Sequence, residues 1–267
     1  HDLSFIHHPD FFSRRQGFWH ALHDYRRQAQ SAHRLIAVSE FTKYDLVQSL
    51  GVPEEKITVI HSGVHPSLTP LPDSDARLAE FRRVHNLSFP FLLFVGTLEP
   101  RKNIPAIIRA FNLIKRSAAM SDLRLVVAGK PGWLYRTILA EAARSPFKDH
   151  IIFWGKIAPH DKLFLYNAAE AFVYPSFFEG FGFPPLEAQA CGTPVVVSDR
   201  TALPEVLGDG ARYVNPWNVD ALAKELHDVL TNRALREDLR KKGIANAGRF
   251  HWQTTARQML NLFQSYE

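Results

Sequence analysis

Residues 172–198, FVYPSFFEGFGFPPLEAQACGTPVVVS, contain a complete strand–loop–helix–strand unit. The apolar start predicts a buried strand, which leads into the glycine-rich loop EGFG at 179–182. Pro184 and Pro185 indicate where the next helix opens, because the first helical position tolerates the missing N–H of proline. The run VVV at 195–197 predicts a second strand without polar alternation, which is typical of a parallel sheet covered on both faces.

Short apolar runs alternate with helix-period segments over almost the whole chain. Strands are predicted at Leu35–Val38, Ile57–Ile60, Phe91–Val95, Leu123–Ala128, Ile151–Phe153, Ala171–Tyr174, Pro194–Val197 and Arg212–Val214. Helices are predicted at Phe18–Ala32, Lys43–Leu50, Asp75–His85, Ile104–Lys115, Leu134–Ala143, Lys162–Ala168, Asp220–Thr231 and Ala234–Glu267, the last with a break near Phe250. This alternation predicts βαβ units and a doubly wound α/β fold.

A domain boundary is expected near residues 66–74. The stretch PSLTPLPDSD, which begins at Pro66, is rich in Pro and Ser and has no hydrophobic periodicity. Linkers between domains have this composition, so residues 1–66 are separated from a larger unit that begins at 67.

Composition narrows the classes of partner. The net charge of +5 favours anionic partners, but Lys and Arg are not gathered into one run, so nucleic acid is not expected. Cys191 is the sole cysteine and excludes an internal disulfide, and no His spacing typical of a metal site appears, so no metal or other cofactor is expected. No apolar run approaches the ~20 residues of a membrane span, and no signal peptide is visible. A cytoplasmic or peripheral protein is therefore expected.

A cationic pair follows another predicted strand. VGTLEPRKN, residues 95–103, ends the run FLLFV and precedes a predicted helix. Ligands of doubly wound sheets bind outside the carboxyl ends of the strands, where Gly96 permits close approach of the backbone. Arg101 and Lys102 would oppose the helix dipole unless they face an anion, which predicts a phosphate site. Two solvated loop cations are the alternative.

Two glutamates lie eight residues apart around the glycine-rich loop. Glu179 is on the loop, and Glu187 is placed in the first turn of the helix. The N–H groups near Gly180 and Gly182, with the start of the helix, could bind a diphosphate. Carboxylates would repel that diphosphate, so both glutamates are expected to accept hydrogen bonds from sugar hydroxyls. Stabilisation of the helix dipole is the alternative for Glu187.

A weaker signal is VAGKPGW at residues 127–133. Gly129 and Gly132 mark a turn or a close backbone approach at the end of a strand. Lys130 could reach a phosphate or a base, and Trp133 could pack on either. A purely structural turn explains the same residues.

Together these motifs resemble the family-4 retaining glycosyltransferases, which have the GT-B fold. The resemblance rests on EGFGFPPLE, VGTLEPRKN, VAGKPGW, CGTPVVVSDRTALPEVLGDGA and VSEFTKYDLVQSLGVPEEKITVIHSGV. It implies the C-terminal part of a Rossmann-like N-terminal domain at 1–66, a Rossmann-like nucleotide-sugar domain at 67–250, and a helix at 251–267 that crosses back. The front of the N-terminal domain, roughly a hundred residues or more, would be missing or carried by a partner chain.

The resemblance also implies residue roles. Arg101 and Lys102 would bind the donor diphosphate, Glu179 would bind the transferred sugar, and His1 would lie near the reaction centre. These four residues form the implied catalytic set. The implied donor-binding residues are Gly96, Lys130, Gly180, Phe181, Gly182, Phe183, Leu186 and Glu187. Gly63 would lie at the crossing between domains. Transfer would proceed with retention and without a metal.

Several functions remain open at this point. GTLEPRKN and GKPGW are most similar to bacterial mannosyltransferases, so mannose transfer from GDP-mannose to a glycan or lipid-linked hydroxyl, as in lipopolysaccharide biosynthesis, is the first hypothesis. A UDP or dTDP sugar, a nucleotide-sugar-binding module without turnover, a GT-B epimerase or phosphorylase, and a glycosidase that uses the two glutamates are the alternatives.

A membrane contact is a further hypothesis. The segment FFSRRQGFWHALHDYRR at 11–27 mixes aromatic and basic residues, a composition that suits an anionic membrane surface. An amphipathic helix packed on the sheet would show the same pattern.

Overall fold

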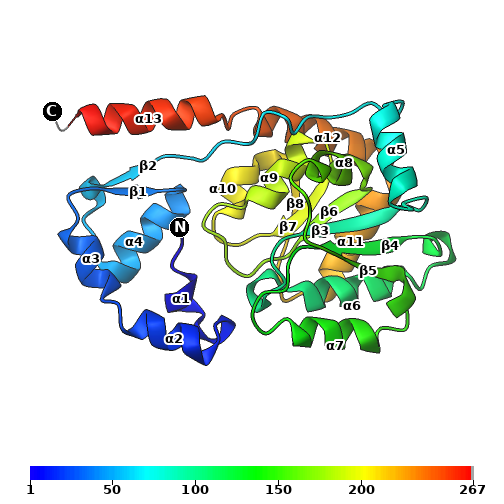
Figure 1. Ribbon diagram of the computed structural model, residues 1–267, viewed down its shortest axis with the longest axis horizontal. Helices are drawn as coiled ribbons and strands as arrows, with labels where there is room; N and C mark the ends of the chain where they lie inside the picture. The colour runs from blue at the N-terminus through cyan, green and yellow to red at the C-terminus, as the bar shows by residue number, and fades with distance from the viewer. Residues whose placement is uncertain (266–267) are drawn as a thin grey trace.

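Two parallel sheets organise the chain in the computed structural model, which describes residues 1–265 (Figure 1). The smaller sheet pairs β1 (Leu35–Ala37) with β2 (Ile57–Val59). The larger sheet has the strand order β5-β4-β3-β6-β7-β8, and each neighbouring pair is parallel. The predicted α/β class is confirmed.

The strand order of the larger sheet reverses between β3 and β6. Its strands are β3 (Phe91–Val95), β4 (Arg124–Ala128), β5 (Ile151–Gly155), β6 (Ala171–Tyr174), β7 (Val195–Ser198) and β8 (Ala211–Val214). The chain runs outward from β3 to β5 and then returns to β6 on the other side of β3. The loops that follow β3 and β6 therefore diverge, which leaves a crevice at the carboxyl ends of these two strands. Each predicted strand is present with its ends shifted by at most two residues.

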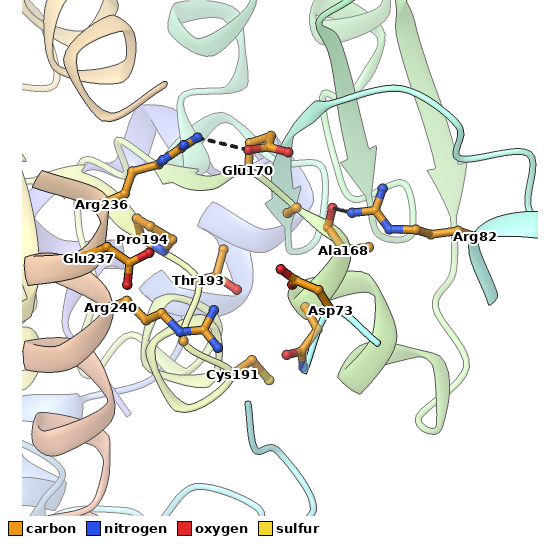
Figure 2. Close-up of a pocket in the computed structure, with 13 residues that line it drawn as sticks. Asp73, Arg82, Ala168, Glu170, Cys191, Thr193, Pro194, Arg236, Glu237 and Arg240 are labelled. Carbon is orange, nitrogen blue, oxygen red and sulfur yellow. Dashed lines mark hydrogen bonds and ion pairs between the residues drawn. The ribbon is translucent and has the colours of Figure 1, made fainter. Parts of the chain in front are cut away.

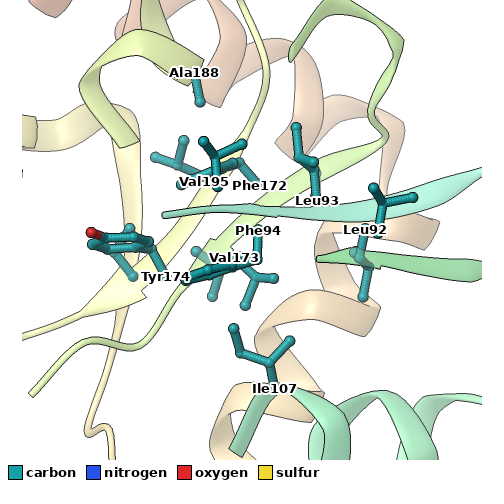
Figure 3. Packing of buried hydrophobic residues seen from close by; sticks show 14 of the residues in the cluster. Leu92, Leu93, Phe94, Ile107, Phe172, Val173, Tyr174, Ala188 and Val195 are labelled. Carbon is teal, nitrogen blue, oxygen red and sulfur yellow. The ribbon is translucent and has the colours of Figure 1, made fainter. Parts of the chain in front are cut away.

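Helices cover both faces of this sheet. They are α5 (Ala76–Val84), α6 (Ile104–Ile114), α7 (Arg136–Arg144), α8 (Asp161–Ala168), α9 (Phe183–Ala190), α10 (Leu203–Leu207), α11 (Val219–Thr231) and α12 (Arg233–Ala247). All residues of β3, β6 and β7 are buried, which explains their unbroken apolar sequence. Figure 3 shows Ile107 of α6 and Ala188 of α9 on opposite sides of the strands that carry Phe94 and Phe172.

The smaller unit packs four helices around β1 and β2. They are α1 (Ser4–His7), α2 (Arg14–Ala21), α3 (Tyr25–Ser31) and α4 (Glu40–Leu50). The prediction of one continuous helix at Phe18–Ala32 is wrong. Ser13 and Gln16 form a capping box that starts α2, and the Asp24 side chain accepts a hydrogen bond from the N–H of Arg27 and starts α3. A side chain that caps a new helix competes with continuation of the previous one.

Residues 66–74 form neither helix nor strand, and the buried residues of the larger apolar cluster begin within this stretch. Ile57 is the last residue of the smaller cluster, and Leu68 is the first of the larger one. The domain limits at 66 and 250 stay a prediction.

The chain ends in α13 (Trp252–Gln264), which runs back alongside the smaller unit (Figure 1). The hydroxyl of Thr255 donates to the carbonyl of His61 at 2.7 Å, so this helix is tied to the chain just after β2. The last two residues of the predicted segment 251–267 lie outside the described residues. No helix within residues 1–265 is long and apolar enough to cross a bilayer.

Candidate active site

A cavity of about 640 Å³ opens at the carboxyl ends of β3 and β6, where the strand order reverses. Its walls come from the loop after β3, the loop after β6, the first two residues and α13. They include His1, Asp2, Gly96, Thr97, Glu99, Arg101, Lys102, Tyr174, Glu179, Gly180, Phe181, Gly182, Phe183, Pro184 and Trp252. A doubly wound sheet binds its ligands at this position.

Arg101 and Lys102 lie on a short 3-10 helix, Pro100–Lys102, between β3 and α6. The Lys102 ammonium donates to Glu179 Oε1 and to the Tyr174 hydroxyl, both at 2.6 Å. The Arg101 guanidinium donates to Glu179 Oε2 at 3.0 Å and to the carbonyl of Phe178 at 2.8 Å. One carboxylate therefore holds both cations at the cavity wall.

The backbone after Lys102 secures this arrangement. Asn103 adopts a left-handed conformation with φ 54°, which asparagine tolerates better than most residues. Its side-chain amide donates to the carbonyls of Pro175 and Pro216, at 3.2 and 2.8 Å. The cationic segment is thus anchored to the loops after β6 and β8.

At the cavity wall three carboxylates face the two cations Arg101 and Lys102. Burial raises the pKa of Glu179, but Lys102 and Arg101 outweigh that effect and hold it at about 2. Glu179 is therefore ionised at neutral pH. Arg101 Nη2 also contacts Glu99 at 2.8 Å, and Nη1 lies 3.7 Å from Asp2. Burial lowers the pKa of Lys102, and Glu179 acts in the opposite sense.

This pairing changes the interpretation of Glu179. The sequence suggested that its carboxylate would stand apart from the phosphate-binding cations and accept sugar hydroxyls. In the structure its two oxygens bind both cations, and the hydroxyl of Ser176 donates to Oε1 at 2.6 Å. Opposite charges at this separation attract more strongly than a neutral hydroxyl can. Only the remaining lone pairs are free for a sugar.

Unpaired backbone amides line the same cavity. The N–H groups of residues 180–183 have no hydrogen-bond partner within the part of the chain that the structure describes. The helix α9 begins at Phe183, after Gly182 at φ 103°. Pro184 and Pro185 carry no N–H, so the prediction that the start of the helix supplies the amides is wrong beyond Phe183. Three of the four donors lie on the loop, and the fourth, at Phe183, belongs to the first residue of the helix.

The family models decide the class of protein. The model for glycosyl transferases group 1 matches residues 77–246, and the model for glycosyltransferase family 4 matches residues 3–68. The chain belongs to the group 1 glycosyltransferases. It is therefore a glycosyltransferase by family.

Curated relatives of this glycosyltransferase include several mannosyltransferases. It is 32% identical over 267 residues to the O-antigen chain mannosyltransferase B of Escherichia coli, covering 99% of this chain and 68% of that protein. It is 30% identical over 229 residues to the serotype-specific mannosyltransferase WbdA of Escherichia coli, covering 85% of this chain and 28% of that protein. The chain thus spans about two thirds of the first relative and less than a third of the second.

Solved structures confirm the GT-B fold of this glycosyltransferase. HepE of Anabaena, solved in complex with UDP and glucose, superposes with a TM-score of 0.80 at 21% identity, over 96% of this chain and 69% of that one. WaaG, a glycosyltransferase involved in lipopolysaccharide biosynthesis, superposes with a TM-score of 0.80 at 18% identity, over 97% of this chain and 69% of that one.

Glu187 of this glycosyltransferase does not line the cavity. The prediction placed it in the first turn of the helix, but it is the fifth residue of α9. Its carboxylate accepts hydrogen bonds from the Lys162 ammonium, at 2.8 Å to each oxygen, and from the Tyr166 hydroxyl at 2.7 Å. With 3.6 residues per turn, this position faces α8 instead of the loop. A role in ribose binding stays a prediction.

The motif VAGKPGW has mainly structural contacts. A Cβ atom at Gly129 would overlap the carbonyl of Gly96, so this glycine allows the loops after β3 and β4 to touch. Lys130 is exposed and does not line the cavity. The Trp133 indole donates to the carbonyl of Phe11 and packs against the smaller unit. Donor binding by Lys130 stays a prediction.

Of the other predicted site residues, some line the cavity and one does not. Gly96, Phe181 and Phe183 line the cavity, whereas the side chain of Leu186 is fully buried in the core. His1 lines the cavity, and its carbonyl packs so closely on Gly180 that a Cβ atom there would overlap it.

Three acceptor residues were missed by the sequence reasoning. Glu99 and Asp2 both face Arg101, and the Tyr174 hydroxyl accepts a hydrogen bond from Lys102. Glu99 stands inside the motif VGTLEPRKN, and Asp2 follows His1, so a search for the counter-charges of Arg101 could have found them. Tyr174 carries no charge and ends a buried strand, so nothing in the sequence marks it as a partner of Lys102.

A second cavity, of about 250 Å³, lies at the amino ends of β6 and β7 (Figure 2). Three arginines on its wall face three carboxylates, and Arg236 pairs with Glu170 at 3.2 Å. Doubly wound sheets bind their ligands at the carboxyl ends of the strands, so this position does not indicate a phosphate site.

No group of three or more His, Cys, Asp or Glu side chains in residues 1–265 is placed to hold a metal ion. Independence from metals stays a prediction.

Proposed function

We propose that this chain transfers a mannosyl group from GDP-mannose to a glycan hydroxyl, with retention at the anomeric carbon. The observation that carries the proposal is the cavity in which Arg101 and Lys102 line the wall together with four unpaired amides, those of residues 180–183. This combination suits a diphosphate, which accepts hydrogen bonds on many oxygens. The mannosyltransferase relatives support the choice of sugar.

The charges of the cavity support a direct role in the departure of the nucleotide. Cleavage of the anomeric bond leaves additional negative charge on the diphosphate. Arg101 and Lys102 are already fixed by Glu179, so they need no reorganisation when that charge develops. The two cations and the loop amides would donate hydrogen bonds to the leaving group, which is why we propose transfer that needs no metal ion.

Calorimetric titration with GDP, UDP, dTDP and ADP tests the donor site. We expect GDP to bind more tightly than the other three nucleotides. Failure of all four to bind would overturn the proposed function. Preference for UDP, dTDP or ADP would overturn the assignment of GDP-mannose and leave nucleotide-sugar binding in place.

A second candidate is a nucleotide-sugar-binding module without turnover. Mass spectrometry of GDP-mannose incubated with the protein and a glycan acceptor separates the two functions. A mannosylated product supports transfer, whereas tight GDP binding without a product supports the module.

We also propose that α2 contacts an anionic membrane, where a lipid-linked acceptor would be found. Phe18, Trp19 and Leu22 are 63%, 55% and 60% exposed, so their apolar side chains are accessible to a membrane surface. Arg14 and Arg15 are exposed one turn earlier and complement anionic headgroups. Flotation with phosphatidylserine-containing liposomes should recover the protein, and Trp19→Ala should reduce recovery. Absence of wild-type flotation would overturn this proposal.

A further inference from the structure

We infer that Glu205, which lies outside the cavity, is a positioning residue for the glycine-rich loop. The geometry indicates that the first turn of α4, in the smaller unit, binds this loop by hydrogen bonds, and that Glu205 holds that turn in place. The inference rests on the proposed function, because the loop carries the amides of the proposed diphosphate site.

The first contact joins α4 to Gly180. The hydroxyls of Ser39 and Thr42 donate to the Gly180 carbonyl at 2.7 and 3.2 Å, and both bonds are buried. A trans peptide is planar, so a fixed Gly180 carbonyl also fixes the direction of the Phe181 N–H. That N–H is one of the unpaired amides of the cavity. Two residues of the smaller unit thus orient a donor that belongs to the larger one.

The second contact joins Glu205 to the same turn of α4. Glu205 Oε1 accepts from the N–H of Glu40 at 2.8 Å, and Oε2 accepts from the N–H of Phe41 at 3.0 Å. The first amides of a helix have no partner within the helix, and a carboxylate there also complements the helix dipole. This cap comes from α10, more than 160 residues further along the chain. It therefore forms only when the two units are docked.

The charge of Glu205 is maintained by its surroundings. His61 Nε2 lies 2.8 Å from Oε1, so both oxygens are occupied. Burial raises the pKa of Glu205, but the hydrogen bonds from His61 and from the two α4 amides outweigh this and lower it below its usual range. The carboxylate is therefore ionised at neutral pH.

The segment just before Glu205 holds the loop from its other side. Thr201 Oγ1 accepts from the Glu179 N–H at 3.0 Å, and the Ala202 N–H donates to the Glu179 carbonyl at 3.3 Å. The loop is thus held by hydrogen bonds with residues 201–202 on one side and with the start of α4 on the other. Glu205 contacts α4 and follows residues 201–202 closely in the chain, so it links these two sets of contacts. Loss of Glu205 should loosen α4, free the Gly180 carbonyl and disorder the amides.

Calorimetric titration of the full chain with GDP tests this inference. We expect Glu205→Ala and Ser39→Ala each to weaken GDP binding about tenfold, which is about 1.4 kcal/mol. Because both act through the same contact of α4 with the loop, the double variant should lose little more than either single variant. Glu205→Gln keeps one acceptor oxygen and should show an intermediate loss. Glu141→Ala is the matched control, since that side chain is 22% exposed against 23% for Glu205 and its ion pair with Arg109 is remote from the cavity.

The outcomes separate this inference from the proposed function. Wild-type protein that binds none of GDP, UDP, dTDP and ADP would contradict the function itself. Wild-type binding together with equal affinity in Glu205→Ala and Glu141→Ala, or with losses that add fully in the double variant, would overturn the inference alone. If circular dichroism shows that Glu205→Ala does not fold, Glu205→Gln decides, and wild-type affinity in that variant would overturn the inference.

Discussion

A single carboxylate, that of Glu179, holds both cations of the cavity wall. It is 6% exposed and contacts Arg101 and Lys102 through different oxygens. A buried charge that loses its partner is strongly destabilising, so removal of any one of these three groups affects the other two. Stability and activity are therefore linked at this residue.

The pH dependence of folding should report this linkage. The pKa of Glu179 falls from 4.5 to about 2 on folding, so its stabilising contribution is present above pH 4.5 and is lost as the pH falls towards 2. By pH 3 the free energy of unfolding should have lost about 2 kcal/mol from this group. Urea unfolding between pH 6 and pH 3 should show a flatter dependence in Glu179→Gln. Parallel curves for the two proteins would contradict the assignment.

The same residues should control turnover. We expect Arg101→Ala and Lys102→Ala each to lower kcat at least tenfold, a loss of about 1.4 kcal/mol of transition-state stabilisation. The physical reason is that each removes a cation from the position where the diphosphate gains charge. Initial rates of GDP release from GDP-mannose measure the effect. Lys241→Ala, an exposed cation on α12, serves as the control. Unchanged rates in both cavity variants would refute the phosphate assignment.

At the scale of elements, the loops after β3 and β4 determine where the cationic segment lies. Gly129 has φ 152°, and a side chain there would collide with the backbone of Gly96. Gly132 packs in the same way against the chain at Leu98, which also pairs with Pro131. The path from β3 to Arg101 therefore depends on two glycines of another loop.

Gly129→Ala should therefore destabilise the fold by about 3 kcal/mol or more, because it adds a steric overlap to an unfavourable φ. Gly155→Ala is the control, since Gly155 has φ 79° and no atom within 4 Å of an added Cβ. That variant should lose only about 1 kcal/mol, the cost of the left-handed conformation. Urea unfolding of both variants measures the difference, and equal losses would show that the contact with Gly96 is not close.

At the scale of the whole molecule, the two units are joined where the chain crosses between them. Val64 pairs with His251, and a Cβ atom at Gly63 would overlap the backbone N of Trp252. Backbone atoms cannot move aside as a flexible side chain can. Contact between the crossing segments therefore requires glycine at position 63, and the family resemblance implied that Gly63 lies at this crossing.

Gly63→Ala should displace the crossing and loosen the two units. We expect a lower Tm and a larger radius of gyration in small-angle X-ray scattering, because the contacts of α13 with the smaller unit would be weakened. Gly17→Ala is the control, since nothing lies within 4 Å of an added Cβ there. Superimposable scattering curves for Gly63→Ala and wild type would contradict this prediction.

Much of the fold followed from local sequence, and part of the site did not. The strands were predictable because hydrophobic periodicity is expressed within a few residues. The division of Phe18–Ala32 into two helices was missed, because the competing cap at Asp24 is a polar signal that periodicity ignores. Arg101, Lys102 and Glu179, which the motifs singled out, line one cavity, since parallel strands bring their carboxyl ends to one edge.

The α/β class, the positions of the strands, and the presence of cations and glycines at the carboxyl ends of β3 and β6 could be predicted from local sequence. These properties depend on neighbours in the chain. The pairing of Glu179 with Arg101 and Lys102, the contact of Glu187 with α8 and the cap that Glu205 places on α4 became visible only in the folded chain. Each of these contacts joins residues more than 20 positions apart, and charge pairing and capping depend on distance in space.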